Sequence, residues 1–128
     1  MPTRVGIDLV RVADVRDALD AHGAHYLARV YTDNEVDDCR GTAGPDPRRL
    51  AARFAAKEAA AKALRVHPDE ALPWTAIEVV RDADGFPALV LHGAAAELAG
   101  ARGITDLVVS LSHEDEYAAA VVSAELVA

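Results

Sequence analysis

The chain has 128 residues, the length of one domain (1–128), and its hydrophobic content of 52% is enough for a packed core. Its formal net charge of −8 argues against a general nucleic-acid binder, and no apolar run approaches the roughly 20 residues of a membrane span. The N-terminus lacks the pattern of a signal peptide and Cys39 is the only cysteine, so we expect a protein of the reducing cytoplasm without an internal disulfide.

The N-terminal stretch is predicted to form a strand. In residues 3–10, Val5, Ile7 and Leu9 alternate with polar residues and glycine, which is the period of a half-buried strand. Asp8 then points to the face opposite Ile7. It is either a site residue at the end of a strand or a cap for the following helix.

A helical block is predicted after this strand. Residues 13–21 form one helix that ends at Gly23, and residues 24–30 form a second. Thr32 and Glu35 have the spacing of a capping box, which opens a third helix. The capping box accounts for both residues structurally, so the pattern assigns no functional role to Glu35.

One long helix is predicted at residues 48–65, a run rich in alanine without glycine or proline. Glu58 lies at one edge of its apolar stripe, Arg53 lies at the other, and Lys62 follows Glu58 by one turn. The stripe itself comprises Leu50, Phe54, Lys57, Ala61 and Leu64. A carboxylate with Arg53, Lys57 and Lys62 near it on the same helix indicates a site for an anion and a metal. The alternative is a plain ion pair between Glu58 and Lys62, which would stabilise the helix by a few tenths of a kcal/mol.

The second half of the chain is predicted to contain two hairpins separated by a helix. The first hairpin joins strands 77–81 and 87–91 through an Asp-Gly turn, and a helix follows at 93–101. The second joins strands 107–111 and 117–126. The expected architecture is therefore α+β, with an N-terminal strand, a helical block containing one long helix, and antiparallel hairpins.

The polar turn at residues 112–116 contains Ser112 and His113. It is either part of a binding site or only a solvated hairpin tip, and the residues alone leave both open.

Six strings spread over the chain resemble holo-acyl-carrier-protein synthases, the short trimeric class of 4′-phosphopantetheinyl transferases. In chain order they are GIDLV (6–10), YTDNE (31–35), ARFAAKEAAAKAL (52–64), WTAIEV (74–79), DGFP (84–87) and VSLSHEDEYAAAVV (109–122). The first, third and last strings are the ones most specific to this family. The resemblance implies the α+β fold of these transferases.

The resemblance also implies an activity and its cofactor. Members transfer 4′-phosphopantetheine from coenzyme A to a serine of an acyl carrier protein, with Mg²⁺, and release adenosine 3′,5′-bisphosphate. The metal ligands of the family fall on Asp8 and Glu58. Lys62 would stabilise phosphate charge, while the base that activates the carrier serine is either Glu58 or a metal-bound water.

Coenzyme contacts are implied at four further positions. By resemblance, Arg53 and Lys57 reach the phosphates of the nucleotide, and Ser112 and His113 line the coenzyme pocket. One departure from the family lies nearby: the family often has a glycine soon after the region of Lys62, whereas residues 65–68 of this chain contain none.

The partners implied by the resemblance are other protein chains. The family forms homotrimers with active sites between subunits, and it docks acidic carrier proteins on basic residues of its first helices, here Arg11, Arg16 and Arg29. Three acids on the first predicted helix, at positions 14, 17 and 20, suggest a specialised carrier domain, such as one of a polyketide pathway, rather than the carrier of fatty acid biosynthesis.

Two other functions use the same residues. Asp8, Glu58 and Lys62 would also suit another metal-dependent enzyme acting on phosphate esters. The fold would also suit a non-catalytic oligomeric interaction domain.

Overall fold

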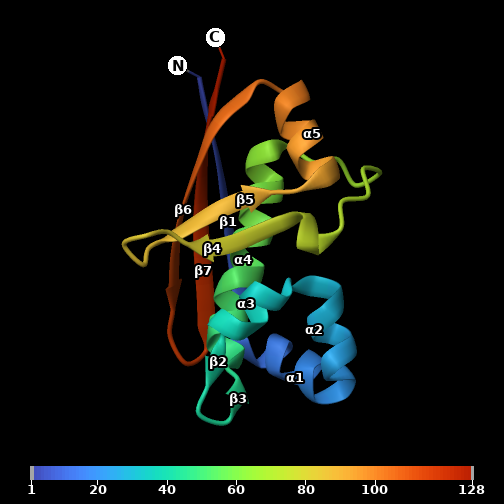
Figure 1. The fold of residues 1–128 in the computed structure, drawn as a ribbon, viewed down its shortest axis with the longest axis vertical. Helices are drawn as coiled ribbons and strands as arrows, with labels where there is room; N and C mark the ends of the chain where they lie inside the picture. The colour runs from blue at the N-terminus through green and yellow to red at the C-terminus, as the bar shows by residue number, and fades with distance from the viewer. Residues whose placement is uncertain (1, 128) are drawn as a thin grey trace.

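A computed structural model of the chain describes residues 2–127, and it has the predicted α+β architecture. Its main sheet is antiparallel with strand order β1-β7-β6, formed by β1 (Thr3–Arg11), β6 (Ile104–His113) and β7 (Tyr117–Leu126). The long helix α4 (Pro47–Leu64) packs along β1 and β7, and Figure 1 shows it running parallel to the length of the sheet.

The remaining elements surround α4. A second hairpin, β4 (Ile77–Arg81) and β5 (Pro87–Leu91), crosses α4 on the side away from the sheet, and its turn reaches out beyond β6 (Figure 1). Three helices, α1 (Val12–His22), α2 (Ala24–Val30) and α3 (Asp33–Asp38), lie near the N-terminal half of α4 (Figure 1). The other bounds are β2 (Arg40–Gly41), β3 (Gly44–Pro45), η1 (Trp74–Ala76) and α5 (Gly93–Ala101).

The helix α4 begins and ends with defined caps. The Asp46 side chain accepts a hydrogen bond from the Arg48 backbone N–H at 3.0 Å, and Pro47 occupies the first turn. At the other end Arg65 adopts the left-handed conformation, with φ of 56°, at the position where helices most often place glycine.

The buried surface of α4 is wider than the predicted apolar stripe. Alanines on the other sides, including Ala52, Ala56 and Ala59, are also buried, because the helix lies between the sheet and the β4–β5 hairpin. Small side chains permit this close packing. A Cβ atom at Gly6 of β1 would overlap the carbonyl oxygen of Ala59.

The orientation of β1 also differs from the expectation. Gly6, Asp8 and Val10 face α4, whereas the apolar residues Ile7 and Leu9 are 61% and 65% exposed on the opposite face of the sheet. A strand has only two faces, and α4 covers the one that carries glycine and aspartate. The described chain therefore leaves an apolar sheet face uncovered.

The other predicted elements are confirmed, and the strand predicted at 107–111 is longer at both ends, at Ile104–His113. Thr32 and Glu35 form the capping box of α3. Strand β6 runs to His113, so Ser112 and His113 belong to the strand rather than to the turn after it. Among residues 2–127, no helix combines the length and the apolar character that crossing a bilayer requires.

Candidate active site

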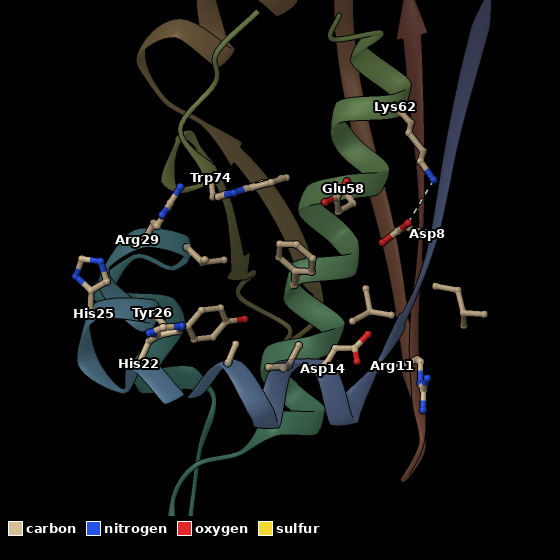
Figure 2. A pocket seen from close by; sticks show the side chains of 16 residues that line it. Asp8, Arg11, Asp14, His22, His25, Tyr26, Arg29, Glu58, Lys62 and Trp74 are labelled. Carbon is tan, nitrogen blue, oxygen red and sulfur yellow. Dashed lines mark hydrogen bonds and ion pairs between the residues drawn. The ribbon is translucent and has the colours of Figure 1, made fainter. Parts of the chain in front are cut away.

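Three of the predicted site residues meet where β1 passes α4. Asp8 points from β1 toward the helix, and Glu58 and Lys62 project from successive turns of it. Lys62 Nζ donates a 2.9 Å hydrogen bond to the Ile7 carbonyl oxygen and lies 3.3 Å from Asp8 Oδ1, the contact dashed in Figure 2. Asp8 and Glu58, which are 50 residues apart in sequence, line the same cavity.

The two carboxylates favour a bound cation. Burial raises the pKa of the Glu58 carboxyl above its ordinary value, the negative charge of Asp8 raises it further, and Lys62 lowers it. A cation between the two acids would offset both unfavourable effects. No cluster of three or more Cys, His, Asp or Glu side chains suited to a metal occurs among residues 2–127. Two carboxylates fit Mg²⁺, which typically takes one or two, together with waters and substrate phosphates.

A cavity of about 1000 Å³ opens beside this group. Figure 2 shows Asp8, Glu58 and Lys62 at one end of it, and His22, His25 and Arg29 of the α1–α2 corner at the other. The cavity is much larger than a metal site alone requires. It has room for a substrate that extends away from the carboxylates.

Two aromatic contacts hold the walls of the cavity. The rings of Phe54 and Trp74 lie 5.2 Å apart between centroids, beside Glu58. On α2, the Tyr26 hydroxyl is 2.9 Å from the hydroxyl of Tyr31, which donates to the Leu50 carbonyl oxygen of α4. These contacts attach the α2 wall and the Trp74 wall to the helix that carries Glu58.

The structure does not bring Lys57 to this cavity, which corrects the expectation that it contacts the nucleotide. Its side chain has no exposed surface, and Lys57 Nζ lies 2.6 Å from Glu35 Oε1. The ammonium group also donates to the backbone carbonyl oxygens of Trp74 and Ile77. All three of its donors are therefore used inside the protein.

Arg53 and His113 lie at a different cavity, of about 370 Å³, between α4, the end of β6 and the β4–β5 turn. Arg49 and Arg81 also line it, and no acidic side chain is among its described lining residues. Arg53 is only 6% exposed, and its buried Nε has no hydrogen-bond partner among the described residues. A buried guanidinium nitrogen without a partner, beside two further arginines, suits a bound anion. We call this the arginine pocket.

Ser112 does not line the arginine pocket. Side chains alternate along β6, so Ser112 points to the uncovered face of the sheet while His113 points to the α4 side. Sequence reasoning missed Arg49, Arg81 and Trp74. Arg49 and Arg81 lie outside the six strings that resemble the family. Only the meeting of α4 with the β4–β5 hairpin brings them together.

Residues 4–122 match the 4′-phosphopantetheinyl transferase superfamily. The chain belongs to this superfamily. This transferase is 49% identical to a holo-[acyl-carrier-protein] synthase of Chloroflexus aurantiacus, over 93% of its own length and 95% of that of the relative. The resemblance drawn from the motifs is thereby confirmed.

Solved structures agree with the family assignment of this transferase. The ACPS–CoA complex of Chronobacterium ammoniagenes matches it with a TM-score of 0.85 and 30% identity, covering all of both chains. The Helicobacter pylori holo-[acyl-carrier-protein] synthase in complex with coenzyme A matches with a TM-score of 0.82 and 27% identity, over 94% of this chain and 99% of that one.

Proposed function

We propose that this protein transfers 4′-phosphopantetheine from coenzyme A to a serine of an acyl carrier protein and releases adenosine 3′,5′-bisphosphate. The observation that carries this proposal is the convergence of Asp8, Glu58 and Lys62 at the end of a large cavity in a chain of this superfamily. Two acids and a lysine can bind a diphosphate through a metal and a direct ion pair.

The cofactor of the proposed reaction is Mg²⁺, held by Asp8 and Glu58. When bound, it would offset the negative charge of the diphosphate of coenzyme A. The carrier serine oxygen forms a bond to the β-phosphorus, and the bond from that phosphorus to the bridging oxygen breaks. Lys62 stabilises charge on the phosphate oxygens. The serine proton passes to Glu58 or to a metal-bound water.

The arginine pocket is proposed to bind the nucleotide end of coenzyme A. Arg53 and His113, with Arg49 and Arg81, supply positive charge for the 3′-phosphate. Within one chain, this pocket and the carboxylates share no lining residue and lie on different sides of α4. We infer that two neighbouring subunits each supply one of these sites to a single coenzyme A.

The uncovered sheet face supports such an assembly. Its large exposed apolar residues are Val5, Ile7, Leu9, Val108, Tyr117 and Val121. A continuous apolar face of this kind is typical of an interface between protein chains. We infer that other copies of this chain cover it, in the trimer that the family resemblance implies, with active sites between subunits. We also infer that the enzyme works in the cytoplasm.

The decisive experiment incubates the enzyme with coenzyme A, Mg²⁺ and an apo acyl carrier protein and measures the carrier by mass spectrometry. The carrier mass should rise by one phosphopantetheine group, and removal of Mg²⁺ with EDTA should prevent the change. Cleavage of coenzyme A without a change in carrier mass would instead identify a phosphate-ester hydrolase. No reaction of either kind would favour a non-catalytic interaction domain.

The preferred carrier can be identified in the same assay. The acids of α1, such as Asp14 and Asp17, would repel a strongly acidic carrier protein. A specialised carrier domain therefore suits this surface better. We expect a higher kcat/KM with a polyketide carrier domain than with a fatty-acid carrier. Equal values for the two carriers would contradict this.

A further inference from the structure

The side chain of Arg102, the C-cap residue of α5, binds both the end of α4 and the loop that follows α4. Its Nη1 donates hydrogen bonds to the carbonyl oxygens of Leu64 and Arg65, at 2.9 and 2.8 Å. Its Nη2 lies 2.8 Å from Glu70 Oε1. Carbonyl groups at the C-terminus of a helix have no partner within the helix, and a cation there also interacts favourably with the helix dipole.

Glu70 extends this network along the loop. Its Oε1 accepts a hydrogen bond from the His67 N–H at 2.8 Å, and its own N–H donates to the His67 carbonyl oxygen at 2.9 Å. The side chains of Arg102 and Glu70 are 23% and 31% exposed, so replacing either one opens no cavity in the core. We call this pair of residues the loop clamp.

The loop held by the clamp forms a wall of a cavity of about 440 Å³. His67, Glu70 and Leu72 line this cavity from the loop, and Glu58 lines it from α4. Glu58 and Trp74 also line the larger cavity, so the two cavities adjoin at the proposed metal ligand. A donor whose diphosphate lies at Glu58 is therefore placed to meet the loop as its chain continues.

We propose that Arg102 is a positioning residue for coenzyme A, because with Glu70 it holds the loop in the conformation that contacts the donor beyond its diphosphate. The proposal rests on the proposed function, since coenzyme A is the donor of that reaction. A loop that is already fixed loses little conformational entropy when the donor binds. Without the clamp, this entropy is lost at binding and the affinity falls. Arg102 acts through the loop and takes no part in the chemical step.

The first test measures steady-state kinetics for Arg102→Ala. The KM for coenzyme A should rise about tenfold, roughly the cost of ordering one loop residue, while kcat and the KM for the carrier stay within about twofold. Glu70→Ala breaks the other side of the clamp and should have the same effect. Glu70→Gln keeps an oxygen that accepts both hydrogen bonds, so it should keep the KM low. Glu97→Ala, at an exposed position on α5, is the matched control and should behave as the wild type.

The second test measures binding by calorimetry. Arg102→Ala should weaken coenzyme A about tenfold and leave adenosine 3′,5′-bisphosphate, which lacks the chain beyond the diphosphate, unaffected. Equal weakening of both ligands would overturn the proposal, because it would indicate a general loss of structure. A change below about twofold for coenzyme A would also overturn it. Glu70→Ala decides the outcome if Arg102→Ala does not fold.

The two tests separate this proposal from the transferase assignment. If the wild type modifies no carrier but the alanine variants weaken coenzyme A alone, the transferase assignment fails and the positioning role stands. If the wild type modifies the carrier and neither variant changes KM or binding, only the positioning role fails.

Discussion

Lys57 Nζ lies 2.6 Å from Glu35 Oε1 inside the core, and neither side chain has exposed surface. Glu35 also accepts hydrogen bonds from the backbone N–H groups of Thr32 and Val79. The pair therefore joins α3, α4 and β4. Because Lys57 also binds the carbonyl oxygen of Trp74, the same interaction fixes a wall of the cavity beside Glu58.

Replacing Lys57 by Met should strongly destabilise the protein. The Glu35 carboxylate would remain buried without its charged partner, and breaking a buried pair typically costs about 3–5 kcal/mol. Urea unfolding followed by circular dichroism measures this loss. The double variant Glu35→Gln/Lys57→Met should recover part of it, because the unpaired charge is gone. A loss below about 1 kcal/mol for the single variant would mean that the pair is not needed for stability.

Gly6→Ala tests the close contact between β1 and α4. The added methyl group would overlap the Ala59 carbonyl oxygen, so the free energy of unfolding should fall by about 3 kcal/mol. Gly100→Ala in α5 is the control, because a Cβ there meets no atom within 4 Å. It should leave stability unchanged or raise it by about 0.5 kcal/mol. Equal melting temperatures for the two variants would contradict the contact.

Glu58→Gln and Asp8→Asn test the carboxylate pair. Each removes one charge at the proposed metal site, and each should lower kcat for carrier modification by at least about 10²-fold. Both should raise the Mg²⁺ concentration needed for half-maximal rate. Glu97→Gln, at an exposed position on α5, should match the wild type. A loss below tenfold for Glu58→Gln would count against Glu58 as a ligand.

Ile7→Glu tests the uncovered face of the sheet. Ile7 is 61% exposed in the single chain, and a charge there should prevent other copies from covering the face. Sedimentation should give a trimer for the wild type and a monomer for the variant, with loss of transfer activity. Val127→Glu, at a position equally exposed but near the end of the chain, should remain trimeric. A monomeric and active wild type would refute the shared site.

Cys39 should be unreactive in the folded protein. The side chain has no exposed surface, and burial raises the pKa of its thiol to about 11. At pH 8, reaction with a disulfide reagent should be at least about 100-fold slower than in guanidinium chloride, where the thiol has its ordinary pKa. Rapid labelling of the native protein would mean that this part of the core opens readily.

Most of the local structure could be predicted from the residues themselves. The capping box at Thr32, the break at Gly23 and the Asp-Gly turn depend on residues only a few positions apart. Short-range hydrogen bonds and side-chain periodicity determine such features before any packing occurs. The motifs around Asp8 and Glu58 likewise indicated the family and the two acids.

The tertiary structure decided which faces and side chains are buried. The alternation in β1 could not show that α4 covers Gly6 and Asp8 rather than Ile7. The spacing of Lys57 on α4 could not show that Glu35 holds it in the core, because that contact joins residues 22 positions apart. The arginine pocket depends on how the β4–β5 hairpin crosses α4. Burial and charge pairing are set by contacts between distant segments, and a pattern within one segment does not contain them.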